Sequence, residues 1–198
     1  MVDTLEATGT LDNTYIFFTS DNGYHLGEHR IGEGKGTPYE ESVRVPLLVR
    51  GPGVAAGRSE TRVATNVDLA STLAALAGES VPDFVDGRSL APLLHAEPDV
   101  SWRESVLVEY GKGAADEPED GVGLSRADND AGIPGKAPSP GTFWLQRTAD
   151  RAYVEYATGE RELYDLAADP LQLRNLAGVP GCAAKLSDRS ANLIALRA

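Results

Sequence analysis

Hydrophobic positions in the first half of the chain follow helix and strand patterns in alternation. Residues 1–13 have the apolar spacing of the last turns of a helix, and Gly9 is a suitable stop. Residues 14–19 are an aromatic and β-branched run that is apolar on both faces, which predicts a strand at the centre of a sheet covered by helices. Residues 45–49 predict a further strand, and Pro46 interrupts its start or places it at an edge. This order of elements is typical of an α/β fold.

Two more helices and a strand are predicted before residue 111. Leucines recur at helical spacing over residues 68–77, where Asn66 can cap the start and Gly78 can end the helix. Residues 89–95 have the leucine spacing of a short helix, and residues 106–110 have the composition of a strand.

The pattern changes in the second half of the chain. Residues 111–141 are rich in Gly, Ala, Pro, Asp and Glu and contain no aromatic residue, which predicts a flexible loop. Short strands are predicted at residues 143–147, 151–156 and 162–164, and helices at 169–176 and 183–197. The chain is thus expected to have three parts: an α/β layer over 1–110, the loop over 111–141, and a small α+β subdomain over 142–198.

Composition narrows the range of partners. The 198 residues have a formal net charge of −12, which disfavours nucleic acid and anionic lipid because both are polyanions. No apolar run approaches the roughly 20 residues that cross a bilayer. Cys182 is the single cysteine, which excludes an intrachain disulfide framework and a cysteine-rich zinc site. We therefore expect no nucleic-acid partner and no membrane span.

The clearest candidates for chemistry follow the strand predicted at 14–19. Asp21 and Asn22 supply a carboxylate and an amide oxygen, which are hard ligands suited to calcium or magnesium. The same Asp-Asn-Gly stretch also favours a simple turn in which Asn or Gly takes a positive φ. Two ligands alone do not make a metal site, so both interpretations stay open.

Lys35 and two histidines are further candidates in the next loop. Lys35 lies between two glycines, which permit close backbone approach and leave a movable cation for an anionic group. A phosphate-binding P-loop is excluded because Gly36 stands where that motif needs Ser or Thr, and an ordinary exposed lysine is the alternative. His25 and His29 have the four-residue spacing of helical zinc ligands, but no third nitrogen or sulfur ligand is evident nearby. Hydrogen bonds of these histidines to a substrate or within the loop are favoured instead.

An acidic pair follows this loop. Glu40 and Glu41 could be imagined as the two carboxylates of a glycosidase. Acidic residues are abundant in this chain, so the pair is interpreted as part of a solvated helix turn.

Three ordered segments together resemble a known family. The strings TSDNGYHLGEH at 19–29 and GKGTPYEESVRVPLLVRGPG at 34–53 are similar to the second conserved half of the type I sulfatases, members of the alkaline phosphatase superfamily. The string ELYDLAADPLQLRNLA at 162–177 resembles the closing signature of the same family. Within the family, the similarity is nearest to bacterial sulfatases that act on sulfated sugars.

This resemblance implies both a fold and a set of site residues. The fold it implies is a partial alkaline-phosphatase-like sheet with helices, followed by the small antiparallel subdomain. Asp21 and Asn22 match ligands of a divalent cation, usually calcium, which orients and neutralises sulfate oxygens. Lys35 matches the catalytic lysine that contacts the sulfate group and helps the leaving oxygen. His25 and His29 are candidate substrate contacts, and the implied substrate is a sulfated small molecule or carbohydrate.

The sequence also departs from the family pattern. Sulfatases of this type attack with a formylglycine made from the Cys or Ser of a C-x-P-x-R motif, whereas Cys182 precedes Ala-Ala-Lys-Leu and no serine version occurs. Residues 1–110 are therefore interpreted as the C-terminal part of the catalytic domain. The formylglycine is expected only in an N-terminal half that would precede Met1 and would also be a partner of this chain. The chain alone is accordingly predicted to be inactive.

Two alternatives remain beside a sulfatase. The same superfamily includes phosphodiester and phosphonate hydrolases, although Asn22 favours a sulfatase because such relatives tend to carry His at that position. The other alternative is a non-catalytic remnant that has lost the active half.

Overall fold

The computed structural model describes residues 1–111 and 141–197. The flexible loop expected at 111–141 therefore lies almost wholly outside the described residues. The chain divides into two compact units. Unit 1 comprises Met1–Asp21 and Val45–Glu104, and unit 2 comprises Asn22–Arg44 and Ser105–Ala198.

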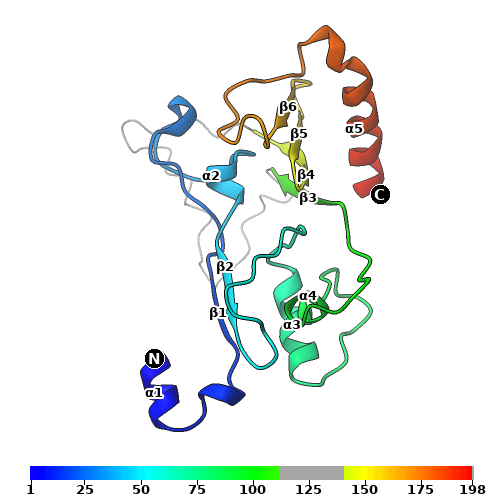
Figure 1. Cartoon of the computed structure of the whole chain (residues 1–198). Helices are drawn as coiled ribbons and strands as arrows, with labels where there is room; N and C mark the ends of the chain where they lie inside the picture. Colours follow the sequence, from blue (N-terminus) through cyan, green and yellow to red (C-terminus); the bar gives the residue numbers. More distant parts are fainter. Residues whose placement is uncertain (112–140, 198) are drawn as a thin grey trace, which may run out of the picture. The chain divides into compact units, whose positions relative to one another are not determined.

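Unit 1 contains a two-stranded sheet and short helices (Figure 1). Its elements are helix α1 (Val2–Ala7), strand β1 (Ile16–Thr19), strand β2 (Leu47–Arg50), helix α3 (Asp68–Leu76) and helix α4 (Ala91–Leu94), with a 3-10 turn at Leu11–Asn13. The strands are antiparallel, and Phe18 lies opposite Leu48. Each of these helices and strands falls where the hydrophobic pattern predicts one.

The surroundings of β1 differ from the prediction. Among the described residues β1 pairs with β2 alone, and Phe18 is 64% exposed and Leu48 59% exposed. The expectation of a strand covered by helices on both faces is therefore wrong for this chain as described. The pattern of apolar residues correctly marks the strand, but it does not say which segment covers its faces.

Asp68, at the start of α3, is the buried polar centre of unit 1. Its side chain is fully buried, and its carboxylate accepts hydrogen bonds from the backbone N–H of Thr65 at 2.9 Å and of Arg88 at 2.8 Å. The guanidinium of Arg103 forms an ion pair with it at 2.6 Å. These partners offset the cost of burying a carboxylate. The prediction that Asn66 caps α3 is wrong. The Asn66 side-chain amide donates to backbone oxygens outside this helix, and it is the Asp68 carboxylate that binds the backbone N–H of Thr65.

Unit 2 is built on a four-stranded antiparallel sheet (Figure 1). The strands follow one another in the order β3 (Ser105–Tyr110), β4 (Phe143–Thr148), β5 (Arg151–Tyr156) and β6 (Arg161–Asp165). The helices are α2 (Glu40–Val43) and α5 (Ala183–Leu196), with 3-10 turns at Glu28–Arg30 and Pro180–Cys182. The antiparallel strands and the terminal helix predicted within 142–198 are confirmed, but β3, expected to belong to the layer over 1–110, is a fourth strand of the same sheet.

The two faces of this sheet cover different partners. On one face Phe143, Leu145 and Val154 form a buried cluster, against which Tyr39 and Val43 pack. On the other face the buried side chains are Tyr153, Leu163 and Leu193, the last from α5. Alternation along the strands separates the two clusters, because successive side chains point to opposite faces. The segment around α2 is thus attached to the sheet face opposite α5.

The short helix predicted at 169–176 is absent from the described structure, where this segment is irregular apart from a turn at 170–171 and a bend at 174. The carboxylate of Asp169 accepts hydrogen bonds from the backbone N–H of Leu173 at 3.1 Å and of Arg174 at 2.8 Å. Gln172 has a φ of 50°, which no helical residue adopts. A side chain that binds the backbone locally competes with helix formation, and here that competition prevails.

Candidate active site

Asp21, the first predicted metal ligand, lies two residues after β1, at the end of the first segment of unit 1. Its backbone oxygen accepts a hydrogen bond from the side-chain amide of Asn66 at 2.8 Å, and Ser20 Oγ donates to its Oδ1 at 3.3 Å. The Asn66 amide also lies 3.3 Å from the backbone oxygen of Ser20. Asn66 therefore fixes the turn that carries the Asp21 carboxylate, a role for which the sequence gave no signal beyond its position before α3.

Asn22 and Lys35, two further predicted site residues, meet within unit 2. Lys35 Nζ donates a hydrogen bond to Asn22 Oδ1 at 3.1 Å, although 13 positions separate them in the chain. The Asn22 amide nitrogen donates to the backbone oxygen of Gly23 at 2.8 Å, which fixes the side chain with its oxygen toward the lysine. The lysine itself is exposed. This arrangement presents a solvent-accessible ammonium next to an amide oxygen.

The loop that carries Lys35 folds back on itself. His25 and Gly34 form an isolated antiparallel bridge, with N···O distances of 2.7 and 3.3 Å. Gly36, on the other side of the lysine, has a φ of 87° and lies against Tyr110, whose ring would be 2.8 Å from an added Cβ. Glycine is therefore required at 36 both for the backbone conformation and for the close approach.

Helix α2 holds both ends of this loop through one residue. Ser42 Oγ accepts hydrogen bonds from the backbone N–H of Gly36 at 3.0 Å and of Thr37 at 3.3 Å. The backbone oxygen of Ser42 accepts from the N–H of Gly23 at 2.9 Å. An added Cβ on Gly23 would come within 1.9 Å of the Glu41 backbone oxygen, so this contact depends on glycine. Ser42 thus connects the residue after Asn22 to the residue after Lys35.

His25 is fully buried in this loop. Its Nε2 is 2.5 Å from Thr37 Oγ1, and its Nδ1 is 3.9 Å from Glu28 Oε2. Burial lowers the pKa of His25 below its ordinary 6.5, an effect that the Glu41 charge partly opposes. The imidazole is consequently neutral near pH 7, and its ring faces the loop rather than solvent.

His29 lies in the same part of unit 2 and is also largely covered. Its ring stacks on Tyr39, with centroids 4.0 Å apart and an interplanar angle of 11°. Its Nε2 is 3.3 Å from Glu41 Oε2, and 10% of its side chain is exposed. The residue has a φ of 57°, an uncommon value for a side chain of this size.

Helix α2 is in turn anchored to the sheet by charge. Glu40 accepts two hydrogen bonds from Arg147 of β4, at 2.7 and 3.0 Å, and only 13% of its side chain is exposed. Its backbone N–H donates to Gln172 Oε1 at 2.7 Å. The helix turn at Glu40 and Glu41 is confirmed, but its expected solvation is wrong, because each carboxylate pairs with a side chain.

The Glu162 carboxyl and three tyrosines near it complete the attachment of α2 to the sheet. The hydroxyl of Tyr39 donates to Glu162 Oε1 at 3.3 Å, and Tyr39 packs edge-on against Tyr164. Burial raises the pKa of the Glu162 carboxyl, and burial together with the Glu162 charge raises the pKa values of Tyr39, Tyr156 and Tyr164. These groups form a polar cluster that fixes the residue just before α2.

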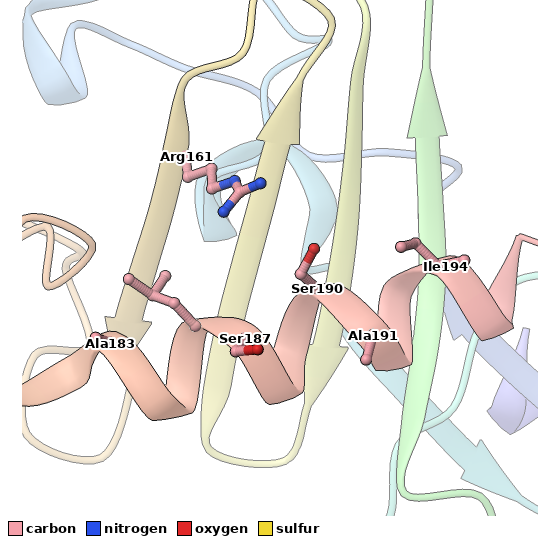
Figure 2. Close-up of a pocket in the computed structure, with 7 residues that line it drawn as sticks. Arg161, Ala183, Ser187, Ser190, Ala191 and Ile194 are labelled. Carbon is pink, nitrogen blue, oxygen red and sulfur yellow. The ribbon is translucent and has the colours of Figure 1, made fainter.

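A groove elsewhere in unit 2 contains none of the predicted site residues (Figure 2). It has a volume of about 560 Å³ and is lined by one side of α5, including Ser190, and by Arg161 of β6. Ser190 Oγ donates to Glu155 Oε1 at 2.7 Å, and Arg161 Nε lies 3.7 Å from the same oxygen. Ser190 and Arg161 are therefore both directed at the Glu155 carboxylate, and its negative charge makes the groove a poor match for an anionic substrate.

Two features are absent from the described residues, a cluster of three potential metal-ligating side chains and a helix that could cross a membrane. Within residues 1–111 and 141–197, no three His, Cys, Asp or Glu side chains gather closely enough to hold a metal ion. In the same part of the chain, no helix has the length and apolar character that crossing a membrane requires.

Comparisons with known proteins give the chain a class and a family. Residues 1–79 match the family model described as Sulfatase. The chain is 38% identical over 189 residues to N-acetylglucosamine-6-sulfatase of Homo sapiens, an alignment that covers 89% of this chain and 34% of that protein. The structure of BT4656 in complex with its substrate D-glucosamine-2-N,6-O-disulfate has a TM-score of 0.79 and 31% identity, with 97% of this chain and 35% of that chain covered. Phosphonate monoester hydrolase of Agrobacterium radiobacter has a TM-score of 0.76 and 30% identity, with 98% of this chain and 37% of that chain covered.

These similarities define the fold as that of the alkaline-phosphatase-like hydrolases, with mixed helices and antiparallel sheets. Within that class, the chain belongs to the sulfatase family, as its sequence motifs predict. It spans about a third of the length of the curated relatives that it resembles.

Proposed function

We propose that this chain contributes part of the substrate site of a sulfatase, a sulfuric ester hydrolase, with Lys35 as the residue that contacts the sulfate group. The observation that carries this proposal is the 3.1 Å hydrogen bond between Lys35 Nζ and Asn22 Oδ1. An ammonium has three N–H donors and so can bind Asn22 and an anionic oxygen together. Hydrogen bonds between charged groups are about twice as strong as neutral ones, which favours a negatively charged sulfate ester over a neutral ligand.

Asp21 and Asn22 are proposed as part of a divalent-cation site, with calcium as the expected ion. Their oxygens have the right chemistry, because calcium prefers carboxylate and carbonyl ligands. Their number is too small, since calcium takes about six to eight oxygen ligands. A cation held there would neutralise charge on the sulfate oxygens. Further oxygen ligands would be needed beside these two residues to complete such a site.

We propose a sulfated carbohydrate as the substrate class. The support is the similarity to N-acetylglucosamine-6-sulfatase and to the structure of BT4656 with a sulfated glucosamine. A phosphonate ester or a phosphodiester is the second candidate substrate class, because the phosphonate monoester hydrolase of Agrobacterium radiobacter has nearly the same TM-score as BT4656. We prefer the sulfatase because position 22 carries the carboxamide of an asparagine.

Substitution of Lys35 tests the proposed contact. We expect Lys35→Met to abolish the saturable backbone-amide shifts that inorganic sulfate produces at Asn22 and Gly36, because the Lys35 ammonium, which hydrogen-bonds to Asn22, is then lost. Sulfate affinity of the unaltered chain should be millimolar, since few groups contact the ion. The measurement is an NMR titration of the 15N-labelled chain with sodium sulfate at constant ionic strength.

The matched control is Lys185→Met, which removes an exposed lysine from α5 and should leave the titration unchanged. Equal affinity of the Lys35→Met and unaltered chains would contradict the proposal, as would the absence of saturable shifts in the unaltered chain. A parallel titration with inorganic phosphate separates the two substrate classes: tighter binding of phosphate than of sulfate would favour the phosphonate alternative.

The chain alone is expected not to hydrolyse sulfate esters. No C-x-P-x-R sequence or serine counterpart occurs among the 198 residues, so the formylglycine proposed as nucleophile cannot form within them. The check is release of 4-nitrophenol from 4-nitrophenyl sulfate by the purified chain with calcium present. A rate that exceeds the buffer rate in proportion to protein concentration, and that Lys35→Met removes, would overturn this expectation.

A further inference from the structure

His25 connects the two segments of the loop that carry Asn22 and Lys35. Its backbone N–H and C=O bind Gly34, the residue before the lysine. Its imidazole Nε2 binds the hydroxyl of Thr37, the second residue after the lysine. His25 therefore contacts the chain on both sides of Lys35, and it follows Asn22 by only three positions.

The burial of His25 favours a specific role for its polar ring. The side chain is fully buried, and no hydrogen-bond partner of its Nδ1 is found among the described residues. Burying an imidazole with one nitrogen unpaired costs free energy that an apolar side chain of similar size would not. The directional bond of Nε2 to Thr37 is the feature that an apolar side chain could not supply.

Thr37 transmits this contact to the lysine. Thr37 is 3% exposed, and its backbone N–H also binds Ser42 Oγ. Gly34 and Gly36, the immediate neighbours of Lys35, both have positive φ values, so the turn itself has little intrinsic rigidity. External contacts are consequently what hold the turn in one conformation.

We propose that His25 is a positioning residue, which fixes the turn around Lys35 through Thr37 so that the ammonium meets Asn22. The proposal rests on the proposed function only in taking Lys35 as the sulfate contact. It assigns His25 a role that acts through Lys35, in place of direct contact with the substrate. His29, stacked on Tyr39 and bonded to Glu41, lies outside this connection.

The test compares two substitutions of His25 that differ in hydrogen bonding. The side-chain amide of His25→Gln reaches about as far as Nε2 and can keep the bond to Thr37, whereas His25→Leu cannot. We expect His25→Leu to weaken sulfate binding about 5-fold, the effect of one lost hydrogen bond, and His25→Gln to stay within about 2-fold. Thr37→Val should match His25→Leu, and the double variant His25→Leu/Thr37→Val should lose no more than either single one.

A ligand-free readout separates this proposal from the sulfate contact itself. The Asn22 side-chain amide resonances should move in His25→Leu toward their position in Lys35→Met, while resonances of β4 and β5 stay in place. Those shifts would support positioning by His25 even if the unaltered chain bound no sulfate. Unchanged Asn22 resonances in a folded His25→Leu chain would overturn the proposal, and so would equal effects of leucine and glutamine.

Discussion

Replacing Asp68 by alanine is expected to lower the free energy of unfolding of unit 1 by about 3–5 kcal/mol, because it leaves the Arg103 charge without its partner in a partly buried place. The substitution also removes the acceptor for the backbone N–H groups of Thr65 and Arg88. Thr65 precedes Asn66, whose amide holds the Asp21 turn. Loss of Asp68 should therefore also release the carboxylate proposed as a metal ligand.

The chain offers a reporter for this experiment. It has two tryptophans, Trp102 in unit 1 and Trp144 in unit 2, so each unit can be followed separately by fluorescence in a single-tryptophan background. Urea unfolding followed by Trp102 in a Trp144→Phe background should show the loss. The exposed carboxylate of Asp83 supplies the matched control, since Asp83→Ala should change stability by less than about 0.5 kcal/mol. A similar small effect of Asp68→Ala would contradict the role assigned to this ion pair.

Replacing Arg147 by methionine is expected to cost unit 2 about 3 kcal/mol and to weaken sulfate binding at the same time. The stability loss follows because Glu40, 13% exposed, would keep its charge without the two hydrogen bonds from β4. The binding loss follows because Glu40 begins α2, and Ser42 of α2 holds both ends of the loop that carries Lys35.

Arg44 provides a control with the same partner. It lies 3.6 Å from Glu40 on the exposed side, with 75% of its side chain in solvent, so Arg44→Met should cost less than about 0.5 kcal/mol. Unfolding followed by Trp144 in a Trp102→Phe background gives the stabilities, and the sulfate titration gives the affinities. If Arg147→Met lowered stability but left the sulfate affinity unchanged, the sheet would not support the site as described.

These contacts explain why the small C-terminal sheet accompanies the candidate site. One face of the sheet packs against α5 and the other against Tyr39 and Val43. Three hydrogen bonds join the start of α2 to residues more than 100 positions away in the chain. The Glu40 carboxylate binds Arg147, the Tyr39 hydroxyl binds Glu162, and the Glu40 backbone N–H binds Gln172. The sheet is thus the support on which the Lys35 loop is held.

Local patterns in the sequence predicted the elements well. The short strands of unit 2 were predicted at nearly the observed residues, and leucine spacing with Gly78 marked α3. The failure at residues 169–176 has a local physical cause, because Asp169 binds two backbone N–H groups that a helix would use otherwise. Proline at the start of a segment indicates a helix only when no nearby side chain competes for the backbone.

The candidate site was predicted in its residues but not in its contacts. Motif similarity named Asn22 and Lys35, yet their hydrogen bond joins positions 13 apart, and no periodic pattern encodes such a contact. His25 is polar and lies in a polar stretch, so its complete burial could not be foreseen from composition. The solvated turn expected at Glu40 was wrong because its partner lies 107 positions away.

Mapping the binding of D-glucosamine 6-sulfate onto the backbone and side-chain resonances of the 15N-labelled chain tests the central claim most directly. The account predicts saturable shifts at the Asn22 side-chain amide and at the backbone amides of Lys35 and Gly36, with none at Arg161, Ser187 or Ser190 in the groove beside α5. Shifts confined to that groove, or shifts at Asn22 that persist in Lys35→Met, would contradict it.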